Sequence, residues 1–210
     1  MLTSGLETMA ADDESLVAHK QEIRTAAQVA RRAQTDKDGL SRLIVGTVTQ
    51  LPAYREAACV MWYIDVRSEV QTRHALPAAI DSGKKVVVPF CVDGELELFH
   101  LESMSELSEG MYKILEPREE LRGVAAKRVR SSDLDIVLVP GVAFDRQGGR
   151  VGHGKGYYDK LLGNVRSDAS LIALAFECQV VDSVPVQTHD VHMDMVVTEN
   201  HVYPGTGRRS

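Results

Sequence analysis

The feature that most constrains the fold of this chain is a series of short, mostly apolar runs spaced along it. The runs are Ala57 to Ile64 (AACVMWYI), Lys85 to Phe90, Leu134 to Pro140 (LDIVLVP), Ser170 to Phe176 (SLIALAF) and Met195 to Thr198. Apolar runs of this length, rich in β-forming residues, are typical of strands that are buried on both faces, as in parallel sheets. We therefore expect an α/β fold, with a mainly parallel sheet in a single domain and helices on both faces.

The expected sheet also contains one antiparallel hairpin, because Asp93-Gly94 joins two strand-like segments. An Asp-Gly pair in this position is a strong signal for a two-residue hairpin turn. Apolar residues at helical spacing predict helices over Glu14 to Gln34 and Asp38 to Leu51. A third helix is expected from Thr72 to Ser82, with Pro77 kinking it or shifting its start.

Composition argues against two classes of partner. The chain has 210 residues and a formal net charge of −6, whereas proteins that bind nucleic acid broadly usually carry an excess of Lys and Arg. No apolar run approaches the ~20 residues that a membrane-spanning helix needs. We therefore expect no nucleic-acid partner and no membrane partner, and we expect a monomer.

The chain has three widely spaced cysteines: Cys59, Cys91 and Cys178. They form no C-x-x-C pair, which argues against a zinc site or a disulfide framework and favours a cytoplasmic location. Residues 1–13 have neither the cationic start nor the apolar stretch of a secretory signal, and we expect a disordered leader there. No linker or repeat divides residues 14–203, and residues 204–210 are expected to form a flexible tail.

A glycine-rich segment, GVAFDRQGGRVGHGKGYYDKLL, follows the apolar run that ends at Pro140. A strand followed by a glycine-rich turn and a helix start presents free backbone N–H groups to one point, and such a point favours an anion. Three glycines there alternate with His153 and Lys155, and Arg150 comes just before them. The segment therefore predicts a phosphate-binding loop at the carboxyl end of a strand.

Two common phosphate motifs do not fit this loop. Gly149 to Lys155 matches the G-x-x-x-x-G-K pattern of a P-loop, but Gly156 stands where that motif needs Ser or Thr for magnesium. The dinucleotide fingerprint G-x-G-x-x-G belongs near the first strand, and the glycines here come late in the chain. A magnesium ligand could instead come from Asp159, with a second carboxylate from Asp190 or Asp194. A plain flexible loop is the alternative interpretation.

Further segments resemble one family. Lys20 and Arg24 lie four residues apart, E-V-Q-T follows a Tyr-Ile strand end, and the chain later reads PGVAFD, RVGHGKGYYD and HDVHMDMVVT. Together with Glu116-Pro117, these motifs resemble the 5-formyltetrahydrofolate cyclo-ligases, also called methenyltetrahydrofolate synthetases. The resemblance covers residues 14 to about 198. It implies an enzyme that uses Mg-ATP to convert 5-formyltetrahydrofolate into 5,10-methenyltetrahydrofolate, ADP and phosphate, through phosphoryl activation of the formyl oxygen.

The resemblance assigns the nucleotide to a set of residues near the start of the chain and in the glycine loop. The implied ATP-binding residues are Lys20, Arg24, Arg150, Val151, Gly152, His153, Gly154, Lys155, Gly156, Tyr157 and Tyr158. Among them, Lys155, Tyr157 and Arg150 would act in catalysis, with Lys155 close to the transferred phosphoryl group. Positioning and charge stabilisation would be the main contributions of the protein, as in other phosphoryl transfers.

The resemblance also implies a metal site and a folate site. Asp159 and Asp194 would hold magnesium. Ile64, Glu69 and Tyr157 would contact the folate, because a carboxylate can accept from the pterin N–H groups and aromatic faces suit stacking. We assign no folate contact to the segment around Pro77 or to the hairpin after the second strand.

Several residues keep a second interpretation. His153 stands where relatives often carry arginine or tyrosine, and a neutral His supplies less charge. Tyr158 suits a core role as well as a ring-stacking role. His189 and His192 have the spacing of a metal pair, but we expect them to shape a loop. Two rival functions stay open: a catalytically idle nucleotide- or folate-binding module, and an ATP-using enzyme that acts on another amide or carboxylate.

Overall fold

The computed structural model describes residues 3–110, 114–187 and 190–208, with side chains from residue 15 onward. Its centre is a seven-stranded sheet with the order β12-β11-β9-β6-β1-β2-β3. The strands are β1 (Cys59–Met61), β2 (Lys85–Val92), β3 (Glu95–His100), β6 (Ile136–Val139), β9 (Ser170–Leu174), β11 (Met195–Val197) and β12 (Val202–Pro204). The five inner strands pair in parallel, and the edge strands β3 and β12 are antiparallel to their neighbours.

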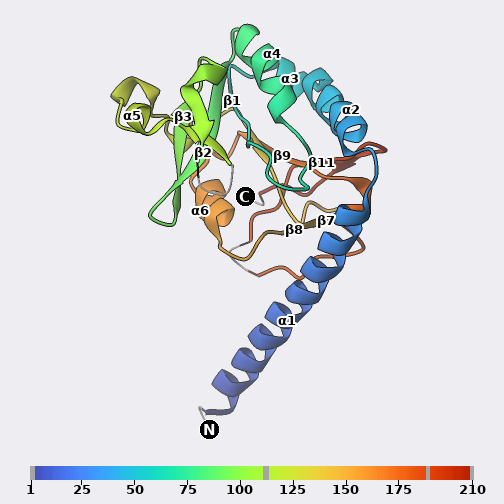
Figure 1. The fold of residues 1–210 in the computed structure, drawn as a ribbon. Coiled ribbons are helices and arrows are strands. Elements are labelled where there is room, and N and C mark those ends of the chain that lie inside the picture. Colours follow the sequence, from blue (N-terminus) through green and yellow to red (C-terminus); the bar gives the residue numbers. More distant parts are fainter. Residues whose placement is uncertain (1–2, 111–113, 188–189, 209–210) are drawn as a thin grey trace.

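Helices cover both faces of this sheet, as Figure 1 shows. They are α1 (Thr3–Ala33), α2 (Lys37–Gln50), α3 (Pro52–Glu56), α4 (Leu76–Asp81), α5 (Glu119–Arg122) and α6 (Tyr157–Gly163). Ile136 and Leu138 of β6 pack into the core cluster that includes α2 and α3. Val137 and Val139 of the same strand pack into the cluster that includes α6. This alternation of side chains explains why the inner strands are apolar at most positions.

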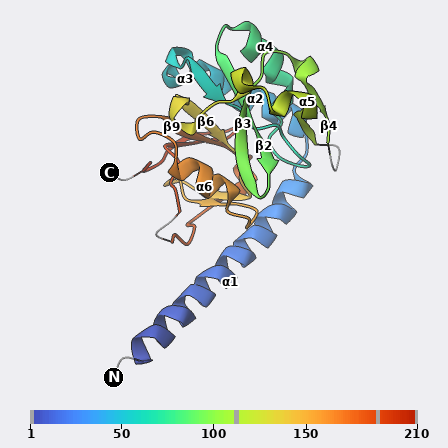
Figure 2. The same cartoon turned by 90° about the vertical axis from the view of Figure 1, so that its left-hand side faces the viewer.

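Two smaller sheets complete the fold. β7 (Ala143–Asp145) pairs with β8 (Arg150–Val151) and with β10 (Val180–Val181), and β4 (Leu107–Glu109) pairs with β5 (Leu115–Pro117). α1 packs on the sheet of β7 and β8 through a small apolar cluster around Ala27. Beyond this contact the helix extends away from the body of the molecule, as Figures 1 and 2 show.

The predicted fold class is confirmed: a mainly parallel sheet with an antiparallel hairpin, covered by helices on both faces. Asp93 and Gly94 have φ of 48° and 82°, the conformation that a two-residue turn between β2 and β3 requires. No helix in the described part of the chain combines the length and the apolar character needed to cross a membrane.

Three boundaries differ from the predictions. The first helix begins at Thr3 instead of Glu14; the added segment contains Leu6, Glu7, Met9, Ala10 and Ala11, which favour a helix, and no proline. The segment expected to be one helix from Thr72 to Ser82 is a 3-10 turn, Arg73–Ala75, followed by α4, with Pro77 in the first turn of α4. The helix expected over Asp38 to Leu51 runs from Lys37 to Gln50, and Pro52 begins the separate helix α3.

The C-terminal segment, expected to be a flexible tail, is hydrogen-bonded as far as the structure describes it. The N–H groups of Gly205 and Gly207 donate to carbonyl oxygens of Asp194 and Met193. The N–H group of Thr206 donates to the carbonyl oxygen of Gln147. Backbone hydrogen bonds of this kind do not depend on the side-chain pattern, so they could not be predicted from the polar, glycine-containing sequence of this segment.

Candidate active site

A cavity of about 1000 Å³ lies beyond the carboxyl ends of β1 and β6. Its wall includes regions that are far apart in the sequence: one side of α1, the segment that follows β1, the β2–β3 hairpin, β5, and the loop between β8 and α6. All the residues predicted to bind nucleotide or substrate line it, together with the predicted metal ligand Asp159: Lys20, Arg24, Ile64, Glu69, Arg150, Val151, Gly152, His153, Gly154, Lys155, Gly156, Tyr157 and Tyr158. The structure therefore brings the predicted phosphate loop and the predicted folate residues into one cavity.

The turn that leads into the glycine loop is built around Asp145, which is 4% exposed. Its Oδ1 accepts from the N–H groups of Gln147 (2.9 Å) and Gly149 (2.8 Å), and its Oδ2 accepts from the N–H group of Val184 (2.8 Å). Gly148 follows with φ of 90°, and a Cβ there would lie 2.3 Å from the carbonyl oxygen of Met193. No role was predicted for Asp145, although an Asp three residues before a Gly-Gly pair is a signal for a side-chain-stabilised turn.

The glycine loop itself leaves backbone donors unused. Within the described residues, the N–H groups of residues 152–156 donate to no protein carbonyl. Arg24 of α1 is hydrogen-bonded to the loop, because its Nε donates to the carbonyl oxygen of Gly152 at 2.9 Å. Gly154 and Gly156 have φ of 91° and 69°, which side chains rarely adopt. Such a row of amide donors is suited to an anion, and α6, with seven residues, adds only a short helix dipole.

The basic side chains around the loop are partly engaged. Lys20 on α1 pairs with Asp190, with 2.6 Å between Nζ and Oδ2. Arg150 is 8% exposed and donates from Nη2 to Oδ1 of Asp159 at 2.5 Å. Its Nε is buried and has no partner within the described chain. Lys155 is exposed and lies over the ring of Tyr157, with Nζ 5.6 Å from the ring centroid. The loop therefore has unused donors from both the backbone and side chains.

A buried carboxylate faces the loop across the cavity. Glu69 is 6% exposed, and its Oε2 accepts from the N–H group of Val66 at 3.0 Å. Its Oε1 lies 3.4 Å from Nε2 of His153, so the loop residue whose role the sequence left open contacts the predicted folate residue. The contact joins the phosphate loop to the segment after β1, which spacing in the sequence could not reveal.

Tyr158 lies between the core and the cavity. Its ring packs against the core cluster that contains α6, and it also lines the cavity. The guanidinium of Arg150 lies over this ring, 5.7 Å from the centroid. Burial raises the pKa of the Tyr158 hydroxyl well above its ordinary value, so the group stays protonated and can only donate or accept a hydrogen bond.

The predicted magnesium ligands are not brought together. Asp159 lines the cavity, but Asp194 does not, and its Oδ2 accepts from the N–H group of Leu171 at 2.7 Å. Asp190, the other carboxylate considered, does line the cavity. The part of the chain that the structure describes contains no group of three or more side chains arranged to hold a metal ion. His189 lies outside the described residues, and His192 contacts the Thr206 hydroxyl at 3.0 Å, away from the cavity.

The fold and this site define an α/β protein with a cation-lined cavity for an anionic ligand at the carboxyl ends of parallel strands. Residues 17–199 match the model of the 5-formyltetrahydrofolate cyclo-ligase family, and the chain belongs to that family. Its relatives carry the names of enzymes, and the chain is an enzyme of this family.

Two relatives and one solved structure illustrate the similarity. The 5-formyltetrahydrofolate cyclo-ligase of Escherichia coli is 31% identical over 70% of this chain and 81% of the relative. A probable cyclo-ligase of Schizosaccharomyces pombe is 29% identical over 79% of this chain and 86% of the relative. The solved structure of 5,10-methenyltetrahydrofolate synthetase from Aquifex aeolicus matches with a TM-score of 0.77 and 30% identity, over 91% of this chain and 95% of that chain.

Proposed function

We propose that the chain uses Mg-ATP to convert 5-formyltetrahydrofolate into 5,10-methenyltetrahydrofolate, ADP and phosphate. The observation that carries the proposal is the single cavity in which the unused donors of the glycine loop face the buried carboxylate of Glu69. An anion fits the first group, and the N–H edge of a pterin fits the second. The names of the relatives supply the substrate.

In this proposal the triphosphate lies along the N–H groups of residues 152–156. Arg150 lies at the start of the loop and Lys155 near its end, and the cations of α1 add charge from beside the loop. Lys20 would exchange its partner Asp190 for a phosphate oxygen, since one ammonium group can redirect its donors. Arg24 already holds the loop backbone, so it would contribute charge without leaving its place.

The reaction would proceed by phosphoryl transfer followed by ring closure. The formyl oxygen attacks the γ-phosphorus, ADP leaves, and the oxygen becomes part of a phosphate leaving group. The neighbouring folate nitrogen then attacks the formyl carbon, phosphate departs, and that nitrogen loses its proton. Little covalent work falls to the protein, so Arg150 and Lys155 act by stabilising charge on the transferred group.

Magnesium would arrive with the nucleotide. Mg²⁺ usually takes one or two protein carboxylates and completes its shell with phosphate oxygens and water, so a full protein cage is unnecessary. Asp159 fits this role, because Arg150 engages its Oδ1 and leaves Oδ2 available. We propose Asp190 in place of Asp194 as the second carboxylate, because only Asp190 lines the cavity.

The folate would lie on the side of Glu69. Its carboxylate would accept from the pterin N–H groups, and Ile64 and Tyr157 would contact the ring faces. The His153 contact with Glu69 would hold this side against the phosphate loop. A monomer in the cytoplasm, with no nucleic-acid or membrane partner, completes the proposal, and the three cysteines of the chain are free thiols.

A turnover assay tests the function directly. Purified protein with Mg-ATP and 5-formyltetrahydrofolate should give a rise in the near-ultraviolet absorbance of the methenyl product, with one ADP released per product formed. Calorimetric binding of ATP and folate without that absorbance would indicate an idle binding module instead. ADP release with an unrelated acid, and none with folates, would indicate a different ATP-using enzyme.

A further inference from the structure

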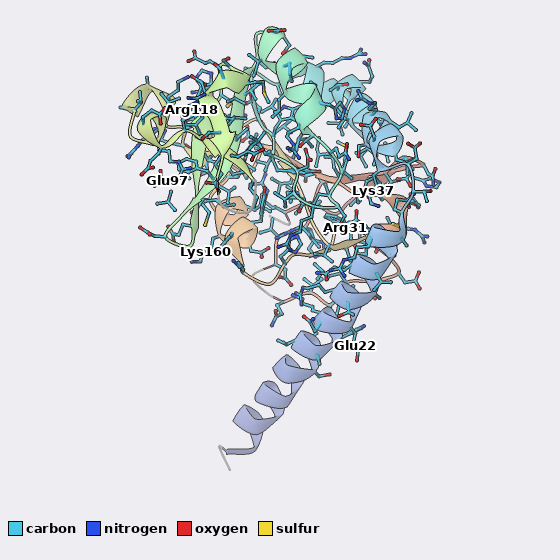
Figure 3. All side chains as sticks on the ribbon, viewed as in Figure 1. Glu22, Arg31, Lys37, Glu97, Arg118 and Lys160 are labelled. Atoms are coloured by element: carbon cyan, nitrogen blue, oxygen red, sulfur yellow. The ribbon has the colours of Figure 1, made fainter. Side chains whose placement is uncertain are left out.

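α1 carries a third basic residue on the face that lines the cavity. Arg31 follows Arg24 by seven residues and Lys20 by eleven, and spacings near whole turns return to the same side of a helix. Figure 3 shows Arg31 on the part of α1 that lies against the body of the molecule. Arg31 is 4% exposed, yet it lines the cavity, so this charge is buried at the inner end of the site.

The guanidinium of Arg31 joins two loops. Its Nε lies 3.1 Å from the hydroxyl oxygen of Ser68, and its Nη1 donates to the carbonyl oxygen of Gly141 at 3.0 Å. Ser68 follows β1 and Gly141 follows β6, and these strands are neighbours in the sheet. Gly141 also accepts from Nε2 of Gln179 at 3.0 Å, which fixes this end of the bridge independently.

The charge of Arg31 has no direct ionic partner in the described part of the chain. Burial lowers the pKa of its guanidinium, and the Glu69 carboxylate nearby is the largest opposing influence. A buried cation is costly unless hydrogen bonds and a neighbouring charge offset its desolvation. In this protein the hydrogen bonds to Ser68 and Gly141 and the negative charge of the nearby Glu69 carboxylate offset the desolvation of Arg31.

We infer that Arg31 is a positioning residue that holds the turn of Ser68 and Glu69 at a set distance from the phosphate loop. Through the Ser68 bond it ties the turn to α1, and α1 is tied to the loop by the bond of Arg24 to Gly152. The carboxylate of Glu69 is thereby fixed relative to the loop amides. The inference rests on the proposed function, because it is the folate that would need both sides at this spacing.

Two substitutions separate the bonds of Arg31 from its charge. Arg31→Met removes both, whereas Arg31→Lys keeps the charge but cannot span the two acceptors as a planar fork does. Arg208→Met is the matched control, because Arg208 donates to the carbonyl oxygens of Val165, Ser167 and Ala169, and none of these four residues lines the cavity. It removes a comparable guanidinium that holds three backbone acceptors elsewhere.

The first readout is amide hydrogen exchange over residues 64–72, which reports the position of the turn whether or not the protein turns over folate. Exchange there should be faster in Arg31→Met and unchanged in Arg208→Met. The second readout is the Kd for 5-formyltetrahydrofolate beside the Kd for a non-hydrolysable ATP analogue. Arg31→Met should weaken folate binding about tenfold or more, the loss expected when a buried polar partner is removed, with nucleotide binding changed less than about threefold. Arg31→Lys should lie between this variant and the unchanged protein.

Two results would overturn the inference. Unchanged exchange over residues 64–72 in Arg31→Met would show that Arg31 does not hold the turn. Equal losses of folate and nucleotide affinity, matched by Arg208→Met, would show a general effect on stability. If the unchanged protein bound no folate at all, the proposed function would fail on its own, and the exchange measurement would still decide whether Arg31 positions the turn.

Discussion

Replacement of Asp145 should destabilise the protein strongly, although the residue contacts no proposed ligand. Its buried carboxylate accepts from three backbone N–H groups, those of Gln147, Gly149 and Val184. A buried donor left without an acceptor costs about 1–3 kcal/mol. Water and a relaxed turn will recover part of the sum, so we expect Asp145→Ala to lower the free energy of unfolding by about 3 kcal/mol.

Asp145→Asn should cost less, because its amide oxygen can still accept from Gln147 and Gly149. The amide nitrogen would then face the N–H group of Val184, donor against donor, where the carboxylate now accepts at 2.8 Å. Loss of the hydrogen bond from Val184, whose N–H group then stays buried without an acceptor, should lower the free energy of unfolding by about 1–2 kcal/mol. The expected order of stability is therefore the unchanged protein, then Asn, then Ala.

Urea unfolding gives these free energies, and thermal unfolding gives a second measure. For a chain of this size each kcal/mol corresponds to roughly 2–4 °C, so Asp145→Ala should lower Tm by about 6–12 °C. Asp38→Asn is the control, because Asp38 forms an exposed i,i+4 pair with Arg42 and accepts no bond from a distant segment. A Tm for Asp145→Ala equal to that of the control would refute the role of the carboxylate in building the turn.

Three further predictions concern catalysis, metal and pH. Lys155→Ala should lower turnover about a hundredfold while the Kd for folate stays nearly constant, and equal losses in both would refute its catalytic role. Asp159→Asn should raise the magnesium concentration needed for half-maximal rate, and an unchanged requirement would remove it from the metal site. Burial alone would raise the pKa of Asp65, but hydrogen bonds from Arg73 and Thr72 leave it below the ordinary 3.8. The pKa of Asp65 is lower in the folded protein than in the unfolded chain. The stabilisation from its ionised carboxylate is therefore complete above about pH 4 and is lost as the pH falls below that value. In urea unfolding, Asp65→Asn should reduce the fall in the free energy of unfolding at acid pH.

The central sheet could be predicted because burial on both faces leaves a local mark on each strand. Ala57 to Ile64 and Leu134 to Pro140 are apolar at nearly every position, and they contain β1 and β6. The glycine loop was predictable for a related reason, since glycines let a ligand approach the backbone amides of a loop closely. Features of this kind can be predicted from a short stretch of sequence, without knowing which distant segments pack against it.

The rest of the site depends on which distant segments meet. Arg31 and Asp145 carry charges that usually mark a surface, and both are buried because acceptors or donors reach them from other segments. The contact of His153 with Glu69 joins residues 84 positions apart. The residues alone left Asp190 and Asp194 both open as metal ligands, and the resemblance selected Asp194. The course of the chain before β11 decides that, of the two, Asp190 lines the cavity.

The helical periodicity of α1 places its basic residues on one side of the helix, and this dependence can be tested. Lys20, Arg24 and Arg31 reach the cavity together only while the helix between them keeps its register. One alanine inserted after Gln28 would turn Arg31 by about 100° and shift it about 1.5 Å relative to Arg24. The buried bonds of Arg31 to Ser68 and Gly141 and the bond of Arg24 to Gly152 could then no longer form together.

The same alanine inserted after Ser15 is the matched control, because it adds the same residue before Lys20 and leaves the register of the three basic residues intact. The insertion after Gln28 should lower Tm and weaken folate binding, whereas the insertion after Ser15 should change neither. Equal effects of the two insertions would show that the cavity depends on the presence of α1 and not on the angular alignment of its basic residues. Measured by thermal unfolding and calorimetry, the pair thus tests whether helical periodicity is what unites the two sides of the site.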